Sequence, residues 1–71
     1  MSKTEMKAAA EAKPFKPFHI RLADGEKLPV DHPNYFAHSP DWRTVIVWDK
    51  DGNFKIVDSA LVTTLEFTGA K

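Results

Sequence analysis

Two Asp-Gly pairs constrain the fold of this chain more than any other feature. Asp24-Gly25 and Asp51-Gly52 each stand between runs in which apolar and polar residues alternate. Asp-Gly readily adopts the positive φ angles of a tight antiparallel turn, and a period of two is typical of a strand with one buried face. The sequence therefore predicts antiparallel β-structure built from hairpins.

The same alternation predicts five strands. They are expected at residues 18–23, 27–31, 43–49, 53–58 and 62–67. Pro29 has no N–H to donate, so we expect its strand to lie at a sheet edge or at a bend. Short strands joined by hairpin turns, without crossover helices, predict a mainly β fold, either a strongly bent five-stranded antiparallel sheet or a small barrel.

The first seventeen residues differ from the rest. Ser2 and Glu5 have the spacing of a capping box, and the run MKAAAEA is rich in helix formers, so a short helix is expected here. Pro14 and Pro17 make KPFKPF an extended connector. We therefore divide the chain into a helical lead with a Pro-rich connector (1–17), a five-stranded β domain (18–67) and a tail (68–71).

Composition narrows the classes of function. The chain has 71 residues, ten basic and ten acidic side chains, and no cysteine. Without cysteine there is no disulfide framework, no thiolate zinc site and no cysteine nucleophile. No apolar run approaches the ~20 residues that cross a bilayer, so we expect a cytoplasmic protein that does not bind membranes. A domain this small has a small core, and we expect a homo-oligomer in which neighbouring copies complete it.

The sequence does not predict an enzyme. Asp31, His32 and His38 match no spacing of metal ligands, and the serines lack the pattern of an activated nucleophile. The three glycines form no phosphate-binding loop. We therefore expect no catalytic residue, no metal and no cofactor.

Three segments resemble the Sm-like proteins of the Hfq type. FHIRLADGEKLPV is similar to the first Sm hairpin, and Asp31-His32-Pro33-Asn34 stands where the family has an acidic residue followed three positions on by asparagine. FKIVDSALVTTLEF is similar in rhythm to the last two Sm strands. The outline covers residues 3–67. The pattern PFKPFHIRLADG followed by SPDWRTVIVWDKDG also resembles a group of short uncharacterised bacterial proteins.

The Sm resemblance implies a ring whose subunits join through the last two strands and bind RNA at a pore lined by residues 31–36. With a lysine of the basic lead, the candidate nucleic-acid-binding residues are Lys13, Asp31, His32, Asn34, Tyr35 and Phe36. The distribution of charge does not favour the β domain (18–67) as the site that binds phosphate. Residues 1–17 carry a net charge of +2, whereas residues 18–67 carry −3.

A second hypothesis involves no nucleic acid. In it the chain is a small β-barrel module that binds protein or regulates a neighbour, using an exposed strand edge or the KPFKPF connector as its contact surface. The two hypotheses differ in salt dependence. RNA binding through phosphates weakens steeply with added salt, whereas an apolar protein contact does not.

Overall fold

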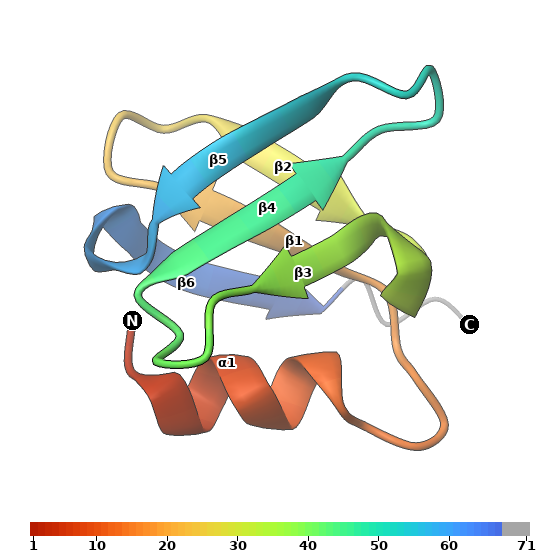
Figure 1. Cartoon of the computed structure of the whole chain (residues 1–71), viewed down its shortest axis with the longest axis horizontal. Coiled ribbons are helices and arrows are strands. Elements are labelled where there is room, and N and C mark those ends of the chain that lie inside the picture. The colour runs from red at the N-terminus through yellow and green to blue at the C-terminus, as the bar shows by residue number, and fades with distance from the viewer. Residues whose placement is uncertain (68–71) are drawn as a thin grey trace.

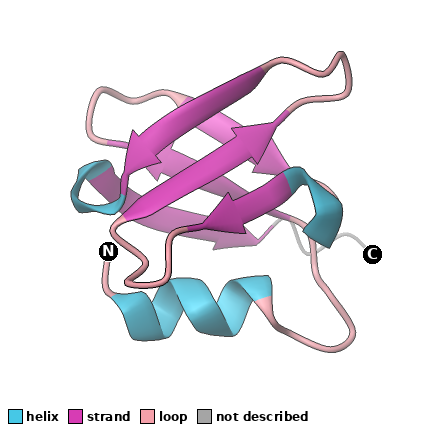
Figure 2. Ribbon diagram, viewed as in Figure 1, coloured by secondary structure: helices cyan, strands magenta, loops and turns pink. Residues whose placement is uncertain are grey.

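The computed structural model describes residues 1–67 as one α-helix and six β-strands (Figures 1 and 2). The elements are α1 (Lys3–Ala10), β1 (Phe18–Leu22), β2 (Lys27–Val30), the 3-10 turn η1 (Pro33–Tyr35), β3 (Phe36–His38), β4 (Thr44–Trp48), β5 (Phe54–Asp58), the 3-10 turn η2 (Ser59–Leu61) and β6 (Val62–Phe67). The expected tail at 68–71 lies outside the described residues. The mainly β class with a short N-terminal helix is confirmed.

The strands form two antiparallel sheets, where the sequence predicts one sheet or barrel of five strands. One sheet has the order β2-β1-β6 and the other has the order β3-β4-β5. Each expected strand is present to within one residue at either end, but β3 is not predicted. With three residues directly after a turn, β3 is too short to show an alternation of apolar and polar side chains. It makes the third strand of its sheet from a segment that we expect to be a connection.

The core lies between the two sheets and α1. In Figure 1 the β3-β4-β5 sheet is in front of the β2-β1-β6 sheet, and α1 runs beneath them. α1 and every strand except β3 contribute to the buried apolar cluster, whose members are Met6, Ala9, Phe18, Ile20, Leu28, Val30, Trp42, Val45, Val47, Val57 and Val62. Because α1 contributes only two of these side chains, most of the core is made by the sheets.

The predicted capping box begins α1. The Ser2 N–H donates to the Glu5 carboxylate at 3.3 Å, and the Glu5 N–H donates to the Ser2 hydroxyl at 3.5 Å. These bonds satisfy N–H groups that a helix start otherwise leaves unpaired. The Ser2 hydroxyl also donates to the Glu5 carboxylate, and this bond, together with that from the Ser2 N–H, holds the pKa of Glu5 below its ordinary value. The connector through Pro14 then leads the chain to β1.

Both predicted Asp-Gly turns are present. Gly25 has φ 93° and Gly52 has φ 87°, a backbone region that side chains other than glycine disfavour. In the first turn the carboxylate of Asp24 also accepts the N–H of Glu26 at 2.9 Å. These turns set the register of the two hairpins.

Pro29 lies on an edge strand, as predicted. The N–H of Leu22 donates to the carbonyl of Glu26 at 2.8 Å, which fixes the phase of the β1-β2 hydrogen bonds. Alternation along the strands then makes His19 and Pro29 a pair without mutual hydrogen bonds. The missing N–H of proline therefore costs no bond to β1.

Trp42 occupies a strained corner before β4. Its φ is 62°, an uncommon value for a bulky residue, yet its side chain is only 5% exposed. A short network holds the corner: the Ser39 hydroxyl donates to Asp41 at 2.7 Å, and the Trp42 N–H donates to the Ser39 carbonyl at 3.0 Å. The ring of His38 stacks on the indole with centroids 3.5 Å apart. Burial and stacking offset the backbone strain.

The two leucines Leu28 and Leu61 give a matched test of this packing. Leu28 is 6% exposed and Leu61 is 52% exposed. We expect Leu28→Ala to lower the free energy of unfolding by about 2–5 kcal/mol because it leaves a cavity. Leu61→Ala is expected to change it by about 0.5 kcal/mol or less. Urea denaturation followed by circular dichroism measures both, and equal losses would contradict the assigned core.

Candidate functional site: two free strand edges

β5 is the outer strand of its sheet and has one row of unpaired backbone groups. The N–H of Ser59 donates to the carbonyl of Arg43 at 2.8 Å, which sets the alternation of bonds along the β4-β5 ladder. In this phase the odd-numbered residues of β5 bond to β4. The outward N–H and C=O groups are those of Phe54, Ile56 and Asp58.

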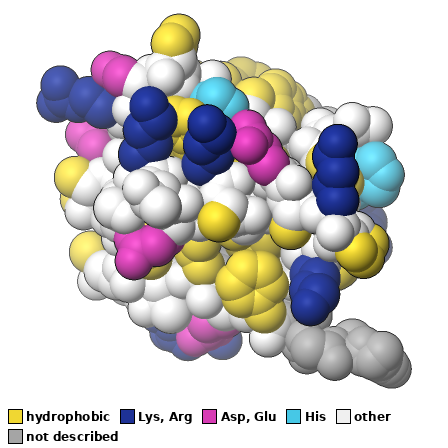
Figure 3. All heavy atoms as spheres, turned by 90° about the horizontal axis from the view of Figure 1, so that it is seen from below, with side chains coloured by type: hydrophobic (Ala, Val, Ile, Leu, Met, Phe, Trp, Pro, Cys, Tyr) yellow, Lys and Arg dark blue, Asp and Glu magenta, His cyan; other side chains and the backbone are white. Residues whose placement is uncertain are grey.

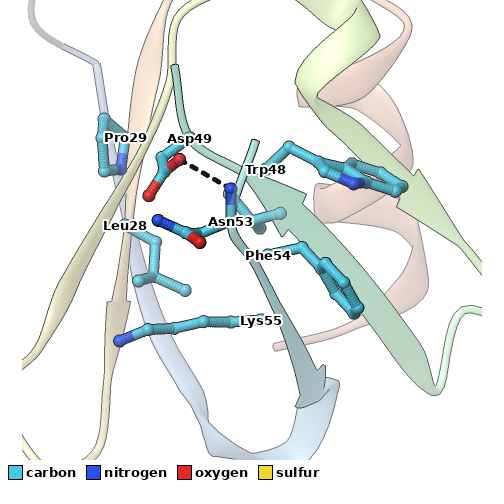
Figure 4. Close-up of a pocket in the computed structure, with 8 residues that line it drawn as sticks. Leu28, Pro29, Trp48, Asp49, Asn53, Phe54 and Lys55 are labelled. Atoms are coloured by element: carbon cyan, nitrogen blue, oxygen red, sulfur yellow. Dashed lines mark hydrogen bonds between the residues drawn. The ribbon is translucent and has the colours of Figure 1, made fainter. Parts of the chain in front are cut away.

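The outward face of the β4-β5 hairpin is apolar. Trp48 lies opposite Phe54, with ring centroids 6.2 Å apart, and Ile46 lies opposite Ile56. Phe54 is 58% exposed and Ile56 is 65% exposed. Figure 4 shows the rings of Trp48 and Phe54 pointing away from β2, on the side of the hairpin opposite the core. The free edge thus adjoins exposed apolar side chains.

β6 is the free edge of the other sheet. Because Leu22 bonds to the β2 side, alternation along β1 directs the backbone of Arg21 to Thr64 of β6. Thr64 and Glu66 of β6 therefore bond to β1. A β-bulge opposite Arg21 and Leu22 changes this alternation before Thr64, where the N–H of Ala23 donates to the carbonyl of Leu61. Beyond the bulge, the outward backbone groups among the described residues of β6 are those of Leu65 and Phe67.

An apolar groove runs between α1 and β6. Its volume is about 510 Å³, and its walls include Ala8 and Ala12 on the helix side and Leu65 and Phe67 on the strand side. Phe67 is 50% exposed. Alanine side chains fill little space, so the helix leaves this groove open beside the free edge.

Ion pairs flank both edges. Glu66 on β6 accepts from Arg21 at 2.9 Å and lies 3.3 Å from Lys27. These two cations, through hydrogen bonds and charge, hold the pKa of Glu66 below its ordinary value. On β5, the ammonium of Lys55 pairs with Glu26 in the β1-β2 turn. Lys55 on β5 and Glu66 on β6 therefore give the two edges side chains of opposite charge.

Carboxylates gather at the β4-β5 turn. Asp49 accepts the N–H groups of Asp51 and Asn53 at 2.9 and 3.0 Å, and Figure 4 shows the second of these bonds. A hollow of about 320 Å³ beside the turn is lined by Asp31, Tyr35 and Trp48 together with the turn residues. The turn is thus an acidic, exposed corner of the molecule.

The structure divides the six candidate nucleic-acid-binding residues. Asp31 and Tyr35 share the acidic hollow, and the side chain of His32 accepts the N–H of Asn34 at 3.2 Å, which caps η1. Phe36 packs against the core, with its ring centroid 6.4 Å from that of Phe18.

Lys13 lies apart from the other five in the sequence. It is exposed in the connector. Within residues 1–67 no hydrogen bond or ion pair joins it to them. Asp31 and Tyr35 thus line one hollow, whereas Lys13 lies on the connector and Phe36 packs against the core.

Sequence reasoning misses the residues that line the free edges. Phe54 and Ile56 look like ordinary strand residues, because alternation alone does not show which face of a hairpin is covered. A signal is nevertheless present in WDKDGNF: the turn places Trp48 opposite Phe54, and the buried Val47 must then face the other way.

Three further findings complete the description. In the described part of the chain, no group of three His, Cys, Asp or Glu side chains is arranged to hold a metal ion. No helix among residues 1–67 has the length and apolar character needed to cross a membrane. No family model, curated protein or solved structure matches the chain significantly. The functional inference therefore rests on the surfaces described above.

The ion pairs of Glu66 predict an acid-dependent loss of stability. Because its pKa is lowered in the folded state, the charged carboxylate stabilises the fold above the unfolded pKa, and this contribution disappears as pH falls through the folded value. We expect Glu66→Gln to show a weaker decline of the urea midpoint between about pH 6 and about pH 3 than the parent chain. Identical declines in the two proteins would contradict the assignment.

Proposed function

We propose that this chain is a non-enzymatic interaction module that assembles with copies of itself by pairing β5 of one copy with β6 of the next. The observation that carries the proposal is the pair of different free edges, each with exposed apolar side chains beside unpaired backbone groups. Edge strands in this state readily pair with another chain. Pairing β5 with β6 uses both of these edges in every copy, whereas pairing β5 with β5 leaves β6 unpaired; β2 and β3 remain the outer strands of their sheets.

A single register matches the regular parts of the two edges. Antiparallel pairing of the outward backbone groups sets Phe54 opposite Phe67 and Ile56 opposite Leu65 of the neighbour. Lys55 then stands opposite Glu66. Aromatic, aliphatic and opposite-charge pairs of this kind each stabilise a sheet by about 0.2–1 kcal/mol.

The neighbouring registers are less complementary. A shift of two residues in one direction places Ile56 opposite Thr63 and leaves Lys55 without Glu66. The shift in the other direction places Asp58 opposite Leu65. The chosen register also places Phe54 and Ile56 beside the groove between α1 and β6 of the neighbour, so apolar side chains from both copies meet there.

Such an interface is heterologous, so it generates a ring if the rotation between copies closes and a filament if it does not. We propose a closed ring, because the order of the strands and the two edges used agree with the Sm resemblance. In the same proposal the two sheets are halves of one small Sm-like barrel. The hollow between β2 and the β4-β5 hairpin, lined by Leu28, Pro29 and Val47, supports this because it adjoins both sheets.

Proline at Ile56 tests the edge pairing. The N–H of Ile56 points away from β4, so Ile56→Pro removes a bond to the neighbour but none within the chain. Pro29 shows that the fold accepts proline at such a position. We expect static light scattering to report an oligomer for the parent chain and single chains for this variant, with similar circular dichroism spectra.

A proline on the opposite edge is the matched control. Lys27 on β2 also lies opposite its β1 partner without mutual hydrogen bonds, and the edge of β2 has no part in the proposed pairing. Lys27→Pro should therefore remain oligomeric. Because Lys27 also pairs with Glu66 at 3.3 Å, Lys27→Ala is measured beside it to account for the loss of that ion pair. A parent chain that is monomeric at all concentrations, or an oligomer that survives Ile56→Pro, would refute the edge pairing.

RNA binding is the second candidate function, favoured by the exposed lysines of α1 and the connector. Lys3, Lys7 and Lys13 are all exposed. On the face that α1 occupies, Figure 3 shows basic side chains in several separate groups with apolar and acidic ones between them. A dispersed arrangement offers fewer adjoining phosphate contacts than a continuous patch. Self-assembly is therefore the better supported function.

The double variant Tyr35→Ala with Lys13→Ala tests the RNA candidate. If the chain binds RNA, we expect nucleic acid to co-purify with the parent protein. We also expect it to bind single-stranded RNA with an affinity that falls steeply as salt is added. The double variant loses this binding without a change in oligomeric state. Equal RNA binding by parent and double variant in a filter-binding assay would rule out the two residues as the site.

A further inference from the structure

We propose that the acidic β4-β5 turn of one copy binds Lys16 in the connector of the next copy. The inference rests on the edge pairing proposed above and names a second, electrostatic part of the same interface. Its partner groups are the carboxylate of Asp51 and the ammonium of Lys16.

Asp51 is the carboxylate that the turn leaves available. Asp49, two residues earlier, is engaged in its own turn, where it accepts two backbone N–H groups. The side chain of Asp51 is exposed, and within the described chain it accepts no hydrogen bond and forms no ion pair. The turn with Asp49, Lys50 and Asp51 carries a net charge of −1.

Lys16 is held in place but is itself unpaired among residues 1–67. It lies between Pro14 and Pro17, which restrict the backbone on both sides. Next to it, Phe15 packs on the core cluster with its ring centroid 5.8 Å from that of Phe18. The backbone is thus anchored while the lysine side chain remains exposed. A restricted segment loses less conformational entropy on binding than a flexible one.

The register brings these two groups to the same end of the interface. Phe54 of one copy stands opposite Phe67 of the next, and within that next copy Phe67 pairs with Phe18. The turn that precedes Phe54 and the connector that precedes Phe18 therefore extend from the same end of three adjacent strands. The outer two of these strands are about 10 Å apart, a span that a lysine and an aspartate side chain bridge together.

Figure 1 agrees with this placement. The β4-β5 turn, the end of β6 and the connector all lie on the right side of the molecule. Copies related by a simple rotation keep these features on one side of the assembly. Within one copy the β4-β5 turn lies near the top of this view and the connector lies near the bottom. In the proposed assembly, the turn of one copy lies next to the connector of the next copy.

A charge exchange tests the contact. Asp51→Lys and Lys16→Glu should each raise the dissociation constant of the assembly about tenfold, because each replaces attraction by repulsion. The double variant exchanges the two charges and should return to within about threefold of the parent value. A dilution series followed by sedimentation velocity measures all four proteins.

Lys3→Glu is the matched control, since it changes the net charge as Lys16→Glu does but lies in the first turn of α1. It should leave the dissociation constant close to that of the parent chain. The outcomes separate the two proposals. A parent chain that never assembles removes the edge pairing itself, and with it the contact.

Assembly that is unchanged in both single variants retains the edge pairing and overturns the contact between Asp51 and Lys16. So does a double variant no tighter than the single ones. If Lys16→Glu loses co-purified RNA while its assembly is unchanged, Lys16 serves nucleic acid, and the contact is likewise overturned.

Discussion

The small number of strands in each sheet is the constraint from which the rest of this structure follows. A three-stranded sheet has two outer strands, and each of them has backbone N–H and C=O groups that no neighbouring strand pairs. Within residues 1–67, only β1 and β4 are paired on both sides. The other four strands are the outer strands of their sheets, and the chain passes directly from β2 through η1 to β3. β5 and β6 remain, at the end of the chain, with unpaired backbone groups and exposed apolar side chains next to each other. A larger protein covers such edges with additional strands or helices. Within residues 1–67 α1 is the only α-helix, and its alanines leave a groove beside β6.

Local signals account for most of the fold that could be predicted. Ser2 and Glu5 mark the helix start, and the two Asp-Gly turns fix the hairpins and thereby the strand ends. β3 escapes prediction because its three residues take their conformation from pairing with Val45, Ile46 and Val47 of β4 rather than from their own pattern. The division into two sheets is also tertiary, since no residue signals which strands fail to pair.

The candidate sites were less predictable for a related reason. The segment from Asp31 to Asn34 suggests a binding site because it is polar and irregular, yet His32 caps a turn and Phe36 packs against the core. Phe54 and Ile56 suggest no site in the sequence, because an apolar residue in a strand is usually buried. Only the three-dimensional arrangement shows that their face of the hairpin is uncovered. Residue type thus points to chemistry, while burial decides which side chains are available for it.

The two tryptophans lie in different environments, so the fluorescence of each one reports a different process. Trp42 is enclosed by the core and stacked on His38, so its emission reports whether the chain is folded. Trp48 lies beside Phe54 on the outward face, where the proposed neighbour would change its surroundings without unfolding the first copy. Replacing either indole by phenylalanine leaves a chain with a single tryptophan. Folding and association can then be followed separately, without an added label.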